Sequence, residues 1–485
     1  MIRRALVAAS ILLASCGGDD KFPPSSDSAA KCAAPRSGTD SATGKPYPDR
    51  QGSIADEKSW LRSWTNERYL WYREVPDPDA KGFATPVDYF AVLKTSAVTA
   101  SGKPKDQFHF WLSTAAWESF SQSGVEAGYG VQWAVLAPRP PRTVVAAFTE
   151  PHSPADQQQI ARGAKVLSVD GEDLVNGSDV NKLNAGLFPS ALNESHTFSI
   201  QDISGATRTV TLMSANIQST PVQNVVTISS APTVGYMLFN DHIATAEAEL
   251  VTAVNKLKGA GITDLVLDLR YNGGGYVAIA SQLAYMIAGP VRTAGKTFEQ
   301  LVFNDKLRSA SPMPFYGRTL GFSTSSDEAL PSLDLGRVFV LTGPGTCSAS
   351  ESVINGLRGA DVTVILVGST TCGKPYGFSP ADNCGTTYFS IQFQGVNDKG
   401  FGDYADGFTP GGTGSAAIAG CLAADDFTHP LGDPNEARLA AALGYRANQT
   451  CPPATSAPAN GLVSLAAADG QLFKSPWREN RILRR

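Results

Sequence analysis

The sequence predicts a multi-domain α/β protein with a helical amino-terminal domain, a β-rich middle domain and a layered α/β core. Apolar residues recur at helical spacing between Trp60 and Leu93. Short strand-like runs separated by turn residues fill residues 124–215, and beyond Thr220 strand-like and helix-like patterns alternate. The chain has 485 residues, enough for about three domains.

The amino terminus has the pattern of an export signal. Met1–Arg4 is basic, and Ala5–Leu13 is apolar but too short to span a bilayer stably. The following Leu-Ala-Ser-Cys-Gly stretch resembles the signal of bacterial lipoproteins, which implies a signal peptide over 1–15 and a lipid on the sulfur of Cys16. Position 17, directly after this cysteine, is Gly rather than Asp, and the resemblance then implies attachment to the outer membrane of a Gram-negative host. We therefore expect a lipid-anchored protein of the bacterial cell envelope, with its soluble body in the periplasm or at the cell surface. An ordinary signal peptide with an incidental cysteine is the alternative.

Residues 16–52 are rich in Gly, Ser, Asp, Lys and Pro and show no periodicity, which predicts a flexible tether. Residues 53–118 are expected to form a helical cap domain. Its aromatic residues Trp60, Trp64 and Trp71 could form a substrate platform, but packing in the core of this domain is the preferred interpretation.

The cysteine count and the charge limit the functional classes. Six cysteines remain after Cys16, and an even number in an oxidising compartment predicts up to three disulfides. Cys372 and Cys384 lie on either side of Lys374, so we predict a bridge between them. No Cys-x-x-Cys spacing or adjacent His pair suggests zinc, and we expect no metal site. With 40 basic and 45 acidic residues, no basic stripe indicates nucleic-acid binding.

The middle segment, residues 119–215, carries two motifs in order. Gly128-Tyr129-Gly130-Val131 precedes an apolar strand, and Ile160–Gly171 has the pattern helix end, turn, strand and turn. Together they resemble a PDZ domain, although another small β-rich domain is the alternative. The resemblance implies that backbone N–H groups of Gly128, Tyr129, Gly130 and Val131 bind a terminal carboxylate while the bound peptide adds a strand.

The predicted core covers residues 216–452, and the polar residues 453–485 are predicted to be a loop-like tail. Three apolar strands of the core are each followed by a segment that could carry chemistry, because a hydroxyl nucleophile needs a base and donors for the oxyanion. Ser348 lies between a strand ending at Thr342 and a helix beginning near Glu351. A helix N-terminus favours developing negative charge, but Ser348 could also be only a helix cap.

The other two segments are a glycine-flanked lysine and a glycine-rich turn. Lys374 follows the apolar strand Val362–Val367, where burial could make its amine a usable base; a solvated surface lysine is the alternative. Asp268–Gly275 is a strand end that opens into a turn with exposed N–H groups. No Lys-Ser/Thr pair follows this turn, which argues against nucleotide binding.

The chain from about residue 120 to 445 resembles the carboxyl-terminal processing (tail-specific) proteases, which are Ser–Lys peptidases with a PDZ domain. The motifs are Asp-Leu-Arg-x-Asn-x-Gly-Gly at 268–275, Ser-Ala-Ser-Glu at 348–351 and the Gly-Lys turn at 373–374. The resemblance implies Ser348 as nucleophile and Lys374 as base, with the backbone N–H groups of Gly274 and Ala349 as the oxyanion hole. It also implies a crotonase- and Clp-protease-like ββα-superhelix core, no cofactor, and protein or peptide substrates with exposed carboxyl-terminal tails.

Two departures keep alternatives open. The family places Gln four residues after the catalytic Lys, where this chain has Phe378, so the chain could be a weak or inactive peptide-binding lipoprotein. Cys347, beside Ser348, is an alternative nucleophile, and His242 is an alternative base. An acyl-CoA enzyme on the crotonase-like fold is disfavoured, because coenzyme A is cytoplasmic and the PDZ-like segment has no place in it.

Overall fold

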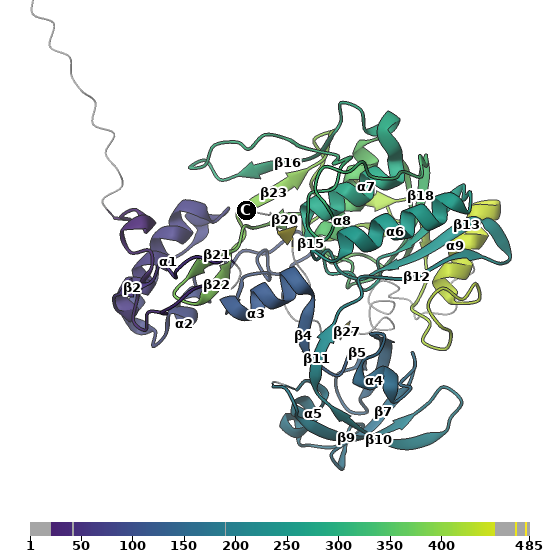
Figure 1. The fold of residues 1–485 in the computed structure, drawn as a ribbon, viewed down its shortest axis with the longest axis horizontal. Coiled ribbons are helices and arrows are strands. Elements are labelled where there is room, and N and C mark those ends of the chain that lie inside the picture. The colour runs from purple at the N-terminus through teal and green to yellow at the C-terminus, as the bar shows by residue number, and fades with distance from the viewer. Residues whose placement is uncertain (1–20, 41–42, 190, 452–470, 473–480, 483–485) are drawn as a thin grey trace, which may run out of the picture.

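The computed structural model describes residues 21–40, 43–189, 191–451, 471–472 and 481–482 (Figure 1). Cys16 and the expected signal peptide lie outside the described residues, so lipid attachment stays a prediction. None of the described helices is both long enough and apolar enough to cross a bilayer.

The core is built on a six-stranded sheet with the order β12-β13-β14-β18-β19-β26. Its strands are β12 (Val222–Ile228), β13 (Ala231–Phe239), β14 (Asp264–Asp268), β18 (Arg337–Thr342), β19 (Thr363–Gly368) and β26 (Gly420–Leu422). Strand β12 runs antiparallel to β13, and every other neighbouring pair is parallel. The carboxyl ends of β14, β18 and β19 therefore lie at one edge of the sheet.

Helices cover both faces of this sheet (Figure 1). The helices are α6 (Ala246–Gly259), α7 (Val277–Thr293, broken at Gly289), α8 (Ala349–Gly359) and α9 (Ala437–Asn448). Helices α6, α7 and α8 share one apolar cluster with alternate residues of the strands, such as Leu267 and Val340, whereas α9 packs with the intervening residues, such as Val266 and Leu341. Burial on both faces explains why these strands read as continuous apolar runs.

The segment expected to be a PDZ domain forms a separate β-rich module at the bottom of Figure 1. Its sheet has the order β10-β9-β7-β6-β5-β27, and β8 pairs with β7. The elements are β5 (Val131–Ala137), β6 (Thr143–Thr149), α4 (Pro154–Gln157), β7 (Lys165–Val169), β8 (Glu172–Asp173), α5 (Val180–Leu187), β9 (Ser195–Gln201) and β10 (Thr207–Met213). The chain enters and leaves through an antiparallel ribbon of β4 (Val125–Gly128) and β11 (Ala215–Gln218).

A buried charge network holds this module against the core. The Arg162 guanidinium donates to Asp425 at 2.6 Å and to the hydroxyl of Tyr271 at 2.6 Å. Arg270, two residues after the end of β14, is also fully buried and pairs with Asp268, Asp425 and Glu436. Each buried guanidinium therefore has a carboxylate partner, as burial of charge requires.

The amino-terminal unit contains α1 (Ile54–Arg68), α2 (Pro86–Phe90) and α3 (Thr114–Glu118). It also contains the sheet β21-β22-β3, in which β3 (Phe110–Ser113) pairs with β22 (Thr386–Phe389), and β22 with β21 (Ala381–Asn383). Trp60 and Trp64 stack at 5.3 Å between ring centroids and pack with Phe90 and Tyr388 in its core. Core packing of these tryptophans is confirmed, and the cap domain includes residues that the sequence analysis assigned to the peptidase core.

The tether predicted over 16–52 is wrong from residue 21 onward. Strands β1 (Lys31–Cys32) and β2 (Arg50–Gln51) pair, and Arg36 forms a bidentate ion pair with Asp49. Cys32 is fully buried and bonded to Cys384. Composition suggested disorder, but contacts to residues hundreds of positions away hold this segment.

The six cysteines form three disulfides, Cys32–Cys384, Cys347–Cys372 and Cys421–Cys451, as their even number predicted. The pairing Cys372–Cys384 is wrong. Cys384 lies in the turn between β21 and β22 of the amino-terminal unit, whereas Cys372 follows β19 of the core. The chain between them crosses from one unit to the other, so nearness in sequence does not bring the two sulfurs together.

Smaller elements complete the fold. A second sheet of the core has the order β17-β16-β23-β20 and contains β16 (Thr297–Phe303), β17 (Met313–Pro314), β20 (Tyr376–Gly377) and β23 (Phe393–Val396). Strand β24 (Thr409–Pro410) pairs with β25 (Ala417–Ile418). Two short strands lie in the tail that was expected to be loop-like. Strand β27 (Gln471–Leu472) pairs with β5, and β28 (Arg481–Ile482) pairs with β15 (Gly275–Tyr276).

Candidate active site

Ser348 lies at the N-terminus of α8, in the connection that follows β18. Its side chain is fully buried, and its Oγ has no hydrogen-bond partner among the described residues. Its backbone has φ +61° and ψ −114°, a conformation that costs free energy for a residue with a Cβ atom. Ala349 is the first residue of α8, and N–H groups in the first turn have no partner inside the helix. The predicted nucleophile and one predicted oxyanion donor therefore share one helix N-terminus.

Lys374 lies in the connection that follows β19, the strand next to β18. Its side chain is fully buried. The Nζ atom is 4.6 Å from the centroid of the Phe108 ring and 4.9 Å from that of Phe378. Phe378, which replaces the family's Gln, thus forms one aromatic wall of the amine site, and Phe108 of the amino-terminal unit forms another.

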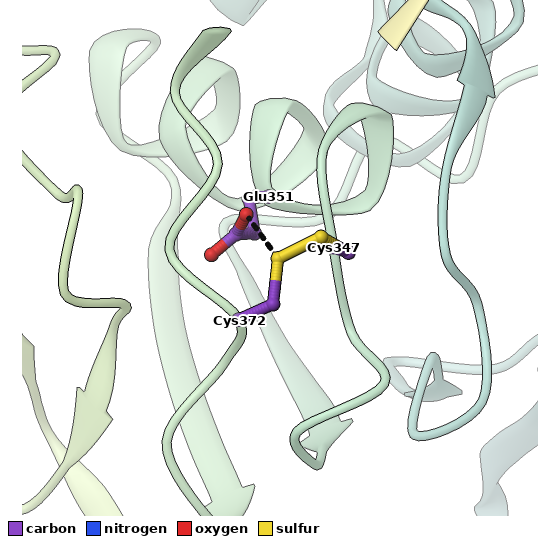
Figure 2. A group of neighbouring side chains, drawn as sticks. All are labelled: Cys347, Glu351 and Cys372. Carbon is purple, nitrogen blue, oxygen red and sulfur yellow. Dashed lines mark hydrogen bonds between the residues drawn. A yellow bond between two sulfur atoms is a disulfide. The ribbon is translucent and has the colours of Figure 1, made fainter. Parts of the chain in front are cut away.

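The Cys347–Cys372 disulfide joins the two connections (Figure 2). It links the residue before Ser348 to the residue two before Lys374, with the bonded Cα atoms 5.2 Å apart. The connections that carry Ser348 and Lys374 are therefore held side by side, and the catalytic pairing of the two side chains stays a prediction. Because the Cys347 sulfur is bonded, it offers no thiolate, and Cys347 is not the nucleophile in this structure.

Glu351 connects the same two segments without a covalent bond. One carboxylate oxygen accepts from the N–H groups of Ser348 at 2.9 Å and Lys374 at 2.8 Å. The other accepts from the Thr371 hydroxyl at 2.5 Å and the Gly373 N–H at 2.9 Å. Burial raises the pKa of Glu351, although these hydrogen bonds oppose the shift. Support of the helix start by Glu351 follows from the Ser-x-x-Glu capping spacing, but its hydrogen bonds to the connection that carries Lys374 could not be read from that spacing.

The glycine-rich turn follows β14 and is held by Asn272. The Asn272 Oδ1 accepts from the Gly274 N–H at 2.9 Å, and its Nδ2 donates to the carbonyl of Phe239 at 2.9 Å. The Gly274 N–H, predicted as an oxyanion donor, is therefore engaged in this structure and would have to leave Asn272 to serve that role. At Gly275, with φ +135°, a Cβ atom would lie 2.4 Å from the carbonyl oxygen of His242, so the turn requires glycine there.

His242 packs against this turn. Its N–H donates to the carbonyl of Gly274 at 3.0 Å, and its carbonyl accepts from Tyr276 at 2.8 Å. The ring Nδ1 lies 3.0 Å from Asn272 Oδ1, an acceptor, which places the proton on Nδ1. Burial lowers the pKa of His242 to about 4, so the ring is neutral at physiological pH. These contacts give His242 a role in holding the turn.

The predicted peptide-binding loop, residues 128–131, borders a pocket in the β-rich module. The pocket is lined by this loop, by the start of β5 and by Leu187 and Phe188 at the end of α5; we call it the peptide groove. Gly130 has φ +76°, and a Cβ atom there would lie 2.2 Å from the Cβ of Ser153. Tyr129 is buried and donates to the carbonyl of Gly186 at 3.0 Å, so its side chain supports the loop from within the module.

Cys347, Glu351 and Cys372 are the one group in the described part of the chain whose ligand atoms cluster closely enough for a metal ion. Their geometry does not fit a metal, because the two sulfurs are bonded to each other and the carboxylate is occupied by four donors.

Comparisons with known proteins agree with this geometry. Residues 233–387 match the model described as peptidase family S41, and residues 56–108 match the peptidase S41 N-terminal domain. A carboxyl-terminal-processing protease of Picosynechococcus sp. is 27% identical over 231 residues, which cover 46% of this chain and 49% of the relative. The chloroplastic carboxyl-terminal-processing peptidase 3 of Arabidopsis thaliana is 26% identical over 318 residues, which cover 61% and 56%. The chain thus spans about half the length of these curated relatives.

Among solved structures, a Bacteroides fragilis protein provisionally classed as an S41 protease has a similar fold. The TM-score is 0.61 at 23% identity, and the match covers 83% of this chain and all of that one. At this identity the likeness concerns the fold, and the mixed α/β architecture with a helical amino-terminal region is confirmed. The ββα superhelix, the PDZ assignment and the domain boundaries stay predictions.

Proposed function

We infer that this chain, which belongs to peptidase family S41, is a serine endopeptidase of the carboxyl-terminal processing type. One observation carries the inference: Ser348 and Lys374 are buried on neighbouring connections that a disulfide and Glu351 fasten together. The Ser348 hydroxyl at the N-terminus of α8 lies where the helix favours developing negative charge.

In the proposed reaction, the Ser348 Oγ attacks the carbonyl carbon of a substrate peptide bond while Lys374 Nζ takes its proton. The Ala349 N–H at the start of α8 stabilises the negative charge that develops on the carbonyl oxygen. The protonated amine then gives its proton to the leaving amino group. Water hydrolyses the acyl-enzyme, again with Lys374 as base. Because the amine must be neutral to accept a proton, cleavage should accelerate as pH rises.

The experiment compares casein cleavage by wild type and by Ser348→Ala, with reaction of wild type towards a serine-directed phosphonate. Wild type should cleave and react, whereas Ser348→Ala should do neither and should unfold at the same temperature. If wild type neither cleaved casein nor reacted with the phosphonate, the proposal would be contradicted. That result would instead favour the alternative of an inactive peptide-binding protein, which the Phe378 replacement suggested.

We further propose that the β-rich module is a PDZ domain that selects substrates by their carboxyl termini. The glycine-containing loop at 128–131, the adjoining strand β5 and the apolar groove wall of Leu187 and Phe188 support this. Amidating a substrate tail removes its charge and one acceptor. The loss of one charge-assisted hydrogen bond costs about 1.5–3 kcal/mol, roughly ten- to a hundredfold in affinity. Equal cleavage of free-acid and amidated substrates would contradict capture by the module.

Lipid attachment at Cys16 is proposed from the signal-like sequence alone. Wild type expressed in a Gram-negative bacterium should incorporate radiolabelled palmitate and fractionate with the outer membrane, and Cys16→Ser should do neither. If wild type incorporated no palmitate and stayed in the soluble fraction, lipid attachment would be refuted, and the proposed peptidase chemistry would be unaffected.

A further inference from the structure

The carboxyl-terminal segment pairs with two functional parts of the chain. Gln471 lies opposite Val135 and Leu472 opposite Ala134, so β27 extends the sheet of the module beside β5 (Figure 1). Ten residues further on, Arg481 lies opposite Gly275 and Ile482 opposite Tyr276, where β28 pairs with β15.

The first pairing takes the edge that a bound peptide would use. Strand β5 leads out of the 128–131 loop and lines the peptide groove, and its other edge is already paired with β6. Strand β27 is antiparallel to β5, so the tail runs towards the loop at this point. A peptide captured by strand addition beside a carboxylate loop has this edge and this direction.

The second pairing lies beside the proposed catalytic residues. Strand β15 begins at Gly275, directly after the turn that carries Gly274. On one side β15 contacts His242, and on the other it pairs with β28. Strand β28 also lies against β20, whose residues Tyr376 and Gly377 follow Lys374 by two and three positions. The tail therefore reaches the space between the glycine turn and the lysine connection.

The charge of the carboxyl-terminal segment also favours its binding to the peptide groove. Residues 471–485 contain five basic residues and one acidic residue, whereas the whole chain has an acidic balance. Glu126 and Glu150 line the peptide groove. A cationic segment is attracted to an acidic body and to a groove that carries carboxylates.

We propose that the chain's own carboxyl-terminal segment, beginning at Gln471, is the resident occupant of the peptide groove and of the space between the glycine turn and the lysine connection, where it competes with other tails. Occupancy rests on the strand pairings, and only its effect on proteolysis rests on the proposed function. A covalently attached segment acts at an effective concentration on the order of millimolar. A tethered segment of micromolar intrinsic affinity therefore weakens the binding of a competing peptide by about 10²–10³-fold, well above tenfold.

The test uses Ser348→Ala, in which cleavage cannot alter the result. A fluorescein-labelled synthetic peptide with the sequence of residues 471–485 is titrated against full-length Ser348→Ala and against Ser348→Ala ending at residue 470. The shortened protein should bind the peptide at least tenfold more tightly. Equal affinity for the two proteins, or no binding to the shortened one, would overturn the proposal.

Full-length variants guard against an effect of truncation. Leu472→Pro with Ile482→Pro, in the Ser348→Ala background, should bind the peptide as the shortened protein does, because proline disrupts strand pairing. Val463→Pro, at a position that precedes both pairings in the sequence, should bind as weakly as full-length Ser348→Ala; the reverse pattern would refute the assignment. Casein cleavage by the protein with Ser348 present tests the proposed function separately. Peptide binding as expected without any casein cleavage would contradict the proposed function and leave the occupancy standing.

A second inference comes from the disulfide in Figure 2. Cys347 is buried, Cys372 is half-buried, and their bridge joins the connections after β18 and β19 that carry Ser348 and Lys374. We propose that Cys347 and Cys372 are positioning residues for the dyad, so that full activity requires the oxidised bridge.

A dithiol reductant would release this constraint. Its thiolate attacks the more exposed Cys372 sulfur, the S–S bond breaks, and Cys347 leaves as a thiolate that takes a proton. The second thiol of the reductant then displaces Cys372, so that the reductant ends as a disulfide and the protein as two thiols. A shift of about 1 Å between catalytic groups is enough to lower a rate a hundredfold.

The chain contains a matched control. The Cys347–Cys372 loop spans 25 residues and the Cys421–Cys451 loop spans 30, so removing either bridge should lower the unfolding temperature by a similar amount. Cys347→Ser with Cys372→Ser should lower kcat at least tenfold, change KM less than threefold and shift the pH profile of kcat. Cys421→Ser with Cys451→Ser should leave kcat, KM and the pH profile of kcat near the wild-type values. Equal kinetic effects of the two double variants would overturn the positioning role.

Discussion

Replacing Glu351 with Gln tests whether this carboxylate holds the two catalytic connections together. The amide is isosteric but puts an NH2 group where one oxygen accepts two hydrogen bonds. If it replaces one oxygen, the N–H groups of Ser348 and Lys374 lose their acceptor, and if it replaces the other, Thr371 and Gly373 lose theirs. Each buried donor left unsatisfied costs about 1–3 kcal/mol, so the free energy of unfolding should fall by about 2–6 kcal/mol.

The assay is urea unfolding followed by tryptophan fluorescence, with kcat measured on the folded protein. We expect Glu351→Gln to lose both stability and activity. Glu247 is the matched control, because it is also buried and accepts from the N–H groups of Leu320, Phe322 and Ser323. Glu247→Gln should lose comparable stability but retain kcat. Less than about 1 kcal/mol of destabilisation with unchanged kcat in Glu351→Gln would refute the reasoning.

Three further predictions concern the dyad, the histidine and stability against pH. Ser348→Ala and Lys374→Ala should each abolish cleavage, and the double variant should be little worse than either single variant because the two act as one unit; additive losses in kcat would count against a dyad. Since burial keeps His242 neutral with a pKa of about 4, His242→Gln should retain the wild-type pH profile of kcat above pH 5, and loss of its rising limb would assign the base to histidine. Burial raises the pKa of Glu249 to about 7, so the fold favours its protonated form, and its contribution to stability is lost as pH rises from about 4 to about 7. Glu249→Gln should therefore be more stable than wild type at pH 8 and nearly equal at pH 4, and chemical denaturation at the two pH values would show whether this difference exists.

The parts of the site predicted from sequence are those fixed by local pattern. The apolar runs that became β14, β18 and β19 could be read directly, and parallel strands bring their following connections to one edge. Ser348 and Lys374 were placed on these connections by residue type and by resemblance.

The parts that sequence could not give depend on contacts between distant segments. Phe108 reaches Lys374 from 266 positions earlier in the chain, and no periodicity connects the two. The pairing of Cys384 with Cys32 depends on a crossing between units that the cysteine spacing does not encode. Asn272 belongs to the motif at 268–275, but its use of the Gly274 N–H depends on side-chain orientation, which the motif alone does not specify.

The Cys32–Cys384 bond has a consequence for how damage to this protein would be seen. It closes a loop of 352 residues, so a single backbone break anywhere inside that loop leaves both fragments covalently joined. The region carrying the expected lipid would stay attached to Ser348 after such a break, and a nicked molecule would migrate as one species on a non-reducing gel. Only reduction would separate the pieces, and preparations judged intact without it could already have been cut.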